Sequence, residues 1–184
     1  MLTLVRALTW PKLIGGAVGL IGFGSIGRVT GRLARLLGVR VVGFDANLAV
    51  TSLVWAEEAT SGRTLDQLLA EADVVSLHVP LTPETRHLID VAKLAQMKPD
   101  AILINTARGG VVDEAAVAKA LRAGKLGGAA LDVFDQEPLA AGSPLAHCPN
   151  LLLTPHVAGV TRESNVRVSM LIAENVAAAL SAHS

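Results

Sequence analysis

The chain has 184 residues and a mass of 19.0 kDa, which is enough for one domain with a substantial core. Apolar residues make up 51%, and sixteen basic residues balance sixteen acidic ones. This composition excludes a strongly basic nucleic-acid binder and an acidic disordered protein. Cys148 is the only cysteine, so no internal disulfide can form, which favours the cytoplasm. The apolar stretch 13–27 is rich in glycine and shorter than the roughly 20 residues of a membrane-spanning helix, so we expect no membrane association.

Short apolar runs alternate with helical patterns along the whole chain. The expected strands cover residues 17–21, 39–44, 74–79, 101–105, 127–134 and 151–154. The expected helices lie at 26–36, after the Thr64–Gln67 capping box, at 114–123 and over 161–184, whereas 46–63 is expected to be mostly loop. The alternation predicts an α/β fold, a doubly wound parallel sheet with helices on both faces.

Two of the expected helices carry an apolar stripe. In the first, the stripe consists of Ile26, Val29, Leu33 and Leu36, and the helix should stop near Gly38. In the last helix, which Thr161 caps, one face holds Val166, Met170, Ala173, Ala177 and Leu180. Such stripes are typical of amphipathic helices that pack one face against a core.

Gly22-Phe23-Gly24-Ser25-Ile26-Gly27 has the G-x-G-x-x-G pattern and lies between an expected strand and an expected helix. Gly22 permits a tight turn, Gly24 lets the backbone approach a pyrophosphate, and Gly27 lets helix and strand pack closely. The free N–H groups at the start of the helix would face the phosphates. The segment therefore predicts a dinucleotide-binding loop.

Asp45 ends the next expected strand, 18 residues after Gly27. A carboxylate at this place can accept hydrogen bonds from both ribose hydroxyls of NAD and would repel the 2′-phosphate of NADP, so we expect NAD. Methyltransferases and other dehydrogenases also combine a glycine loop with a later acid. The first half of the chain alone thus indicates dinucleotide or nucleoside binding without defining a reaction.

Three polar residues in the second half follow the carboxyl ends of expected strands, where open α/β sheets bind ligands: Arg108, Glu137 and His156. An arginine can bind a carboxylate with two hydrogen bonds, and a histidine can give or take a proton near neutral pH. A glutamate can hold the imidazole in one tautomer. Reduction of a 2-keto acid needs such a set. His78 is interpreted as structural, and the other histidines lack the spacing of metal ligands, so we expect no metal site.

With these segments the sequence resembles the NAD-binding domain of the D-isomer-specific 2-hydroxyacid dehydrogenases, over residues 13–180. The motifs in family order are the glycine loop, 79–82, 105–110, 137–138 and 155–156. The resemblance implies an NAD(P)-binding Rossmann fold and a cytoplasmic oxidoreductase that moves a hydride between NAD(H) and a 2-hydroxy or 2-keto acid. The run 156–169 resembles the sulfolactate dehydrogenase branch of this family.

The resemblance also implies roles for individual residues. Arg108 would bind the substrate carboxylate and polarise its carbonyl, and His156 would be the acid/base with Glu137 as its partner. Ser25 and Ile26 would meet the pyrophosphate and Asp45 the adenosine ribose. The remaining implied cofactor contacts are Gly22, Gly24, Gly27, Val79, Pro80, Thr106, Ala107, Arg108, Asp132, His156 and Gly159, of which Asp132 would take the nicotinamide carboxamide and Gly159 would lie beside the ring.

Members of the family have a second, substrate-binding domain. Residues 1–16 resemble the end of the helix that links the two domains, so we interpret 1–184 as a single dinucleotide-binding domain without its substrate domain. We expect such a chain to fold and bind NAD but to turn over slowly or not at all. Leu2, Leu4, Val5 and Leu8 would be a remnant homodimer contact. The alternative is a non-catalytic NAD-binding or redox-sensing module, which would not need Arg108, Glu137 and His156.

Overall fold

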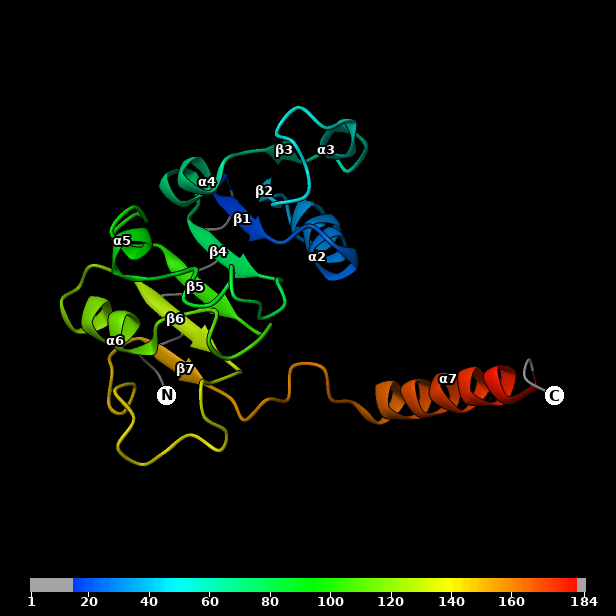
Figure 1. The fold of residues 1–184 in the computed structure, drawn as a ribbon. Helices are drawn as coiled ribbons and strands as arrows, with labels where there is room; N and C mark the ends of the chain where they lie inside the picture. The colour runs from blue at the N-terminus through cyan, green and yellow to red at the C-terminus, as the bar shows by residue number, and fades with distance from the viewer. Residues whose placement is uncertain (1–14, 182–184) are drawn as a thin grey trace.

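The computed structural model of the chain describes residues 15–181, which form one parallel sheet with helices on both faces (Figure 1). The strands are β1 (Ala17–Ile21), β2 (Arg40–Phe44), β3 (Ser61–Gly62), β4 (Val74–Leu77), β5 (Ile102–Asn105), β6 (Gly128–Leu131) and β7 (Leu151–Leu153). The helices are α2 (Ser25–Leu36), α3 (Leu53–Glu57), α4 (Leu65–Glu71), α5 (Val91–Leu94), α6 (Glu114–Arg122) and α7 (Arg162–Ser181). The predicted fold class is confirmed.

The order of the strands in the sheet is β3-β2-β1-β4-β5-β6-β7. The chain runs outward from β1 to β3 and then crosses back to β4, on the other side of β1. Ile21 pairs in register with Phe44 of β2 and with Leu77 of β4, so the carboxyl ends of these strands share one edge. In open parallel sheets, the reversal of strand order beside β1 opens a crevice at that edge, and ligands bind there.

Burial of apolar side chains explains why this sheet has two covered faces. All five residues of β1 are buried, as expected for a strand that lies between two helical layers. The larger core cluster joins the central strands to α4, α5 and α6, for example through Leu69 and Val117. The smaller one lies beneath α2 and α3, where the rings of Phe23 and Trp55 pack with centroids 4.6 Å apart.

The expectation that 46–63 is mostly loop holds for the majority of its residues, but the stretch also contains α3 and β3, which the sequence did not predict. Ser52 caps α3 by accepting a hydrogen bond from the Val54 N–H. Trp55, in the middle of this helix, has a buried side chain. A helix of five residues is too short to show a 3.6-residue period, so its sequence gives no helical signal. By contrast, the capping box of Thr64 and Gln67 at the start of α4 is confirmed.

α2 forms as predicted, but its apolar stripe faces away from the sheet. Ile26, Val29, Leu33 and Leu36 are between 51% and 83% exposed, whereas the buried residues of the helix are Gly27 and Gly31. A Cβ atom on Gly31 would lie 3.2 Å from the Leu20 side chain of β1. The helix therefore packs on the sheet through its glycines, because only a face without side chains can come so close.

α7 also forms as predicted, and Thr161 caps it by accepting a hydrogen bond of 2.9 Å from the Ser164 N–H. None of its residues is buried, and the helix extends away from the sheet (Figure 1). The stripe expected on one of its faces therefore has no core to pack against in the described part of the chain. β4 and β6 end at Leu77 and Leu131, earlier than predicted, where the chain leaves the sheet for the crevice.

Two expectations fall wholly or almost wholly on residues 1–14, which lie outside the described residues: the linker-helix remnant of 1–16 and the dimer contact through Leu2, Leu4, Val5 and Leu8. Among residues 15–181, no helix combines the length and the apolar character that crossing a membrane would require.

Candidate functional site

The glycine loop follows β1 and leads into α2 at the crevice edge. Gly22 has a φ of +94°, and its N–H donates to the Phe44 carbonyl of β2 at 2.8 Å. This backbone conformation is one that residues with a side chain rarely adopt. A Cβ on Gly27 would lie 2.2 Å from the Gly22 carbonyl oxygen, whereas a Cβ on Gly24 would meet no atom within 4 Å. The loop is thus closed on the protein side and open at Gly24, on the side where a ligand would approach.

Asp45 lies directly after β2 and reaches across to the glycine loop. One carboxylate oxygen accepts a hydrogen bond of 2.8 Å from the Phe23 N–H, and the other accepts one of 2.9 Å from the Asn47 N–H. Each oxygen keeps a further lone pair, and the side chain is partly exposed. The structure therefore brings the predicted ribose-binding acid next to the predicted phosphate-binding loop.

A cavity of about 220 Å³ lies beside the loop, between the ends of β4 and β5. It is lined by Ile26, His78, Val79, Pro80, Thr106, Ala107 and Arg108. All of these except His78 are residues that the sequence predicts to meet the cofactor. The structure thus joins side chains from three separate segments of the chain in one cavity at the crevice edge.

His78 is the lining residue whose position sequence reasoning did not assign to the site. Its Nε2 lies 3.1 Å from the Ser76 hydroxyl, and the ring is largely buried. Burial lowers the pKa of His78 below its ordinary value, so the imidazole is neutral at physiological pH. The signal that could have placed it in the cavity is its position directly before Val79, at the end of β4.

The turn that carries Arg108 is shaped by Asn105, the last residue of β5. The Asn105 side chain is 1% exposed. Its amide nitrogen donates to the Arg108 carbonyl at 2.9 Å, and its amide oxygen accepts from the Ala107 N–H at 3.0 Å. The guanidinium of Arg108 is exposed and donates one hydrogen bond to the Ala107 carbonyl. Sequence reasoning did not single out Asn105, although a polar residue at the end of an apolar strand is a signal for such a role.

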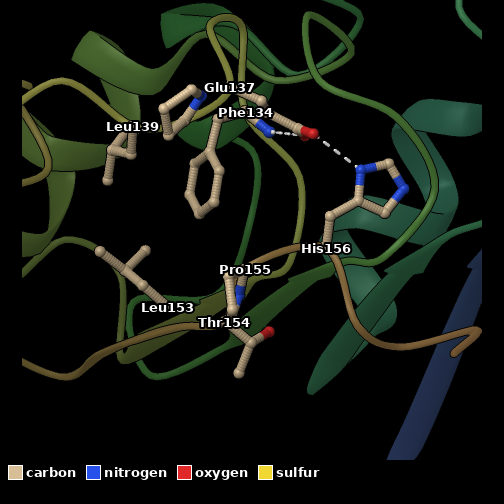
Figure 2. A pocket seen from close by; sticks show the side chains of 8 residues that line it. Phe134, Glu137, Leu139, Leu153, Thr154, Pro155 and His156 are labelled. Carbon is tan, nitrogen blue, oxygen red and sulfur yellow. Dashed lines mark hydrogen bonds and ion pairs between the residues drawn. The ribbon is translucent and has the colours of Figure 1, made fainter.

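Glu137 and His156 come from different loops and form a pair. The distance between Glu137 Oε2 and His156 Nδ1 is 2.8 Å, and Glu137 Oε1 accepts a hydrogen bond of 3.1 Å from the Phe134 N–H (Figure 2). The hydrogen bond from His156, followed by that from Phe134, lowers the pKa of Glu137. The carboxylate is therefore charged at neutral pH and selects the tautomer with a proton on Nδ1. The other ring nitrogen, Nε2, points away from Glu137 (Figure 2).

The backbone of His156 is held by Asp132, the residue after β6. His156 has a φ of +53°, and its N–H donates to the Asp132 carbonyl at 2.8 Å. The left-handed conformation costs a residue with a side chain about 1–2 kcal/mol, so it needs support from its surroundings. The Asp132 carboxylate, which is 3% exposed, accepts hydrogen bonds from the Thr154 hydroxyl and from the N–H groups of Val157 and Ala158.

Burial acts to raise the pKa of Asp132, but the hydrogen bonds from Thr154, Ala158 and Val157 outweigh it, so the pKa is lower than usual. The carboxylate is therefore a charged, buried anchor inside the turn. Gly159 lies exposed just after this turn, and its carbonyl accepts a hydrogen bond of 2.9 Å from Ser164. Thr154 is a further residue of the site that sequence reasoning did not identify.

A second cavity, of about 330 Å³ and largely apolar, lies beside the Glu137–His156 pair (Figure 2). It is lined by Phe134, Glu137, Pro138, Leu139, Leu153, Thr154, Pro155 and His156. Within residues 15–181, no group of three or more His, Cys, Asp or Glu side chains is arranged to hold a metal ion.

Fold and site together define a dinucleotide-binding α/β domain with a histidine–carboxylate pair in the loops that follow β6 and β7. Comparison with known proteins gives the family. Residues 5–158 match the sequence model described as "D-isomer specific 2-hydroxyacid dehydrogenase, NAD binding domain". The chain therefore belongs to the D-isomer-specific 2-hydroxyacid dehydrogenase family and contains its NAD-binding domain, which confirms the resemblance and the cofactor class inferred from the sequence.

Individual relatives agree with this assignment. The chain is 50% identical over 175 residues to (S)-sulfolactate dehydrogenase of Chromohalobacter salexigens, covering 95% of this chain and 56% of the relative. It is 45% identical over 175 residues to glyoxylate reductase of Thermofilum pendens, with 94% and 51% covered. The crystal structure of D-lactate dehydrogenase from Aquifex aeolicus with NAD and lactic acid superposes with a TM-score of 0.80 at 35% identity, over 91% of this chain and 54% of that one. The chain thus spans about half the length of the curated relatives it matches.

Proposed function

We propose that this chain is the cofactor-binding part of an NAD-dependent oxidoreductase that interconverts a 2-hydroxy acid and the corresponding 2-keto acid. The observation that carries the proposal is the contact of 2.8 Å between Glu137 Oε2 and His156 Nδ1. A carboxylate that fixes one ring nitrogen leaves the other available to give or take a proton. A module that only senses NAD has no use for such a pair, so the pair favours an enzyme.

The residues of the crevice suit NAD. The open side of Gly24 leaves room for a pyrophosphate near the N-terminus of α2, where the free N–H groups favour a negative charge. Asp45 would hold the adenosine ribose with the lone pairs that Phe23 and Asn47 leave free. The cavity of about 220 Å³ would receive the nicotinamide half, with Val79, Pro80, Thr106 and Ala107 as its walls. We also propose that Asp45 excludes NADP, because its charge would repel the 2′-phosphate.

When bound, NADH supplies the hydride for C2 of the keto acid, and NAD⁺ accepts it in the reverse direction. Arg108 lies at the wall of the nicotinamide cavity and would pair with the substrate carboxylate through two N–H groups. His156 would donate the proton on Nε2 to the carbonyl oxygen as that oxygen becomes a hydroxyl. Glu137 stabilises the imidazolium that donates this proton, and in the reverse direction it keeps Nε2 unprotonated and ready to accept one.

Two features support a homodimer in the cytoplasm, which we also propose. Beyond Ile26, which lines the cofactor cavity, the apolar stripe of Val29, Leu33 and Leu36 runs along the outer side of α2, and an exposed apolar patch on a helix is typical of a protein interface. The single cysteine, Cys148, suits a reducing compartment. Sedimentation of the wild type and of the Leu33→Glu variant at micromolar concentration tests the dimer, since a charge on the stripe should produce monomers. A wild type that sediments as a monomer contradicts it.

The function itself is tested in two steps. Calorimetric titration with NADH, and with NADPH alongside, should show binding of NADH and much weaker binding of NADPH. NADH oxidation is then followed at stoichiometric protein concentration, where slow turnover is visible, with glyoxylate and with pyruvate carrying a sulfonate on C3. The His156→Ala variant should lose turnover and keep its NADH affinity. Equal turnover by the variant and the wild type would contradict the role of His156.

A further inference from the structure

We propose that Thr154 is a positioning residue for His156, acting through the carboxylate of Asp132. The role given to His156 rests on the proposed function, whereas the positioning itself is a property of the folded chain. The inference begins with the 154–158 turn. His156 and Val157 are both exposed, and the backbone at His156 is left-handed. Packing therefore contributes little to the shape of this turn, and its hydrogen bonds must determine where the imidazole points.

These hydrogen bonds converge on one residue. The Asp132 carbonyl accepts from the His156 N–H at 2.8 Å, Oδ1 accepts from the Thr154 hydroxyl at 2.5 Å and from the Val157 N–H at 2.9 Å, and Oδ2 accepts from the Ala158 N–H at 2.9 Å. The turn thus wraps around a buried carboxylate, with donors on both sides of His156. A negative charge is well suited to this place because successive backbone N–H groups point at it.

Within this arrangement, Thr154 supplies the only side-chain donor that the described residues offer to the Asp132 carboxylate. The other donors belong to the backbone of the turn and move with it. The Thr154 N–H, by contrast, bonds to the Leu131 carbonyl at 3.1 Å and so ties Thr154 to the end of β6. The hydroxyl therefore holds the carboxylate in a fixed orientation relative to the sheet. The Asp132 backbone is itself tied to the sheet, because its N–H donates to the Asn105 carbonyl at 2.9 Å. Without the hydroxyl, the carboxylate and the 157–158 part of the turn can therefore rotate about the point where the Asp132 carbonyl holds the His156 N–H.

Such a rotation would act on the Glu137–His156 pair. Glu137 is held from its own loop by the Phe134 N–H, and its bond to His156 is its contact with the turn, so a shift of the turn acts directly on that bond. The distance of 2.8 Å between Glu137 Oε2 and His156 Nδ1 would lengthen, and the preference for a proton on Nδ1 would weaken. We therefore expect the tautomer of His156 to report on the hydroxyl of Thr154, although the two side chains are not bonded to each other.

The test is the tautomer of His156 in the complete 184-residue chain, measured by long-range ¹H–¹⁵N correlation NMR at alkaline pH, where an imidazole is neutral. Thr154→Val removes the hydroxyl at constant shape, and Thr154→Ser retains it. Thr161→Val is the matched control, because it removes a threonine hydroxyl from the same loop region without contact to Asp132. The wild type, Thr154→Ser and Thr161→Val should show the Nδ1-protonated form, whereas Thr154→Val should shift toward the Nε2-protonated form.

A wild-type tautomer in Thr154→Val would overturn the proposal. If that variant does not fold, Thr154→Ala provides the same test without a methyl group facing the carboxylate. Loss of cooperative unfolding in both variants would also overturn it, since Thr154 would then be a residue of general stability. Where turnover is measurable, Thr154→Val should lower kcat by roughly 10- to 100-fold with little change in NADH affinity, the size expected for a misplaced catalytic group. The NMR result needs no substrate, so it stands apart from a failure of the proposed reaction.

Discussion

The 22–27 loop and the 154–158 turn lie at the same edge of the sheet, and each contains a left-handed residue that is stabilised in a different way. Each is held by a carboxylate that follows a strand, Asp45 after β2 and Asp132 after β6. Each also contains a left-handed residue, which is a glycine in the first loop and His156 in the second. A loop that leaves room for a ligand can use glycine, which adopts the left-handed conformation without strain. A turn that presents a side chain to a ligand cannot use glycine at that place, so hydrogen bonds have to stabilise its left-handed residue.

The largest effect should come from Gly27→Ala, which tests the closed side of the glycine loop. The new Cβ would lie 2.2 Å from the Gly22 carbonyl oxygen, so backbone must move. We expect a loss of about 3 kcal/mol in the free energy of unfolding, measured with urea, and loss of NADH binding. Gly24→Ala is the control, because its Cβ meets no atom within 4 Å. It should leave stability within about 0.5 kcal/mol and weaken only cofactor binding. Equal destabilisation by both variants would contradict the comparison.

Asn105→Ala tests whether the buried side chain of Asn105 stabilises the turn that follows β5 and carries Arg108. The substitution leaves the Ala107 N–H and the Arg108 carbonyl without their partner in a partly buried place. We expect a loss of about 2 kcal/mol in the free energy of unfolding by urea denaturation. The exposed neighbour offers a control, since Thr106→Ala should change stability by less than about 0.5 kcal/mol. A stable Asn105→Ala protein would show that the Arg108 turn needs no such support.

Asp45→Ala separates the structural role of this carboxylate, which accepts from the Phe23 N–H, from its proposed role in cofactor binding. It removes the acceptor of the Phe23 N–H, which should cost about 1 kcal/mol of stability because the site is open to water. Affinity for NADH in calorimetry should fall about tenfold, equivalent to 1.4 kcal/mol, and affinity for NADPH should fall less or rise. Asp66→Ala, which removes an exposed carboxylate on α4, should change neither affinity. A parallel loss of both affinities would contradict the role of Asp45 in choosing NAD.

The smallest effect concerns pH. Burial lowers the pKa of His78 in the folded state, so the unfolded chain binds this proton more readily. Stability from the neutral ring is therefore complete above the ordinary pKa of 6.5 and is lost as the pH falls through the lowered folded value. The free energy of unfolding in urea should decline less on acidification in His78→Asn than in the wild type. An unchanged slope in His78→Asn would contradict the prediction.

How far the sequence predicts this molecule depends on whether a signal is local. β1 is a continuous apolar run and β5 is one up to its last residue, Asn105, so the residues of these strands alone identify them. The glycine loop is equally local, and its place between β1 and α2 was predicted. α3 escaped prediction because five residues do not show a helical period, and the orientation of α2 escaped because its packing face consists of glycines, which carry no apolar signal.

In the candidate site, the sequence indicates the side chains that could do chemistry, but it does not indicate the residues whose hydrogen bonds hold them in place. Arg108, Glu137 and His156 stand out because each chemistry-bearing side chain follows a strand. The contributions of Asn105 and Thr154 depend on hydrogen bonds that form only when strand ends and loops come together. A spacing along the chain cannot reveal that Thr154 reaches Asp132, which is 22 residues away.

The exposure of α7 on all its sides has a consequence for local unfolding of the chain in solution. Among residues 15–181, no side chain of the helix is buried, so its backbone hydrogen bonds supply much of its stability, and a single 20-residue helix is only marginally stable in water. Its amide protons should exchange with solvent by local fraying, at rates insensitive to urea, while those of β1 exchange only when the whole sheet unfolds. Hydrogen exchange would then divide the described residues into two units, with the boundary between Ala158, whose N–H bonds to Asp132, and the start of α7.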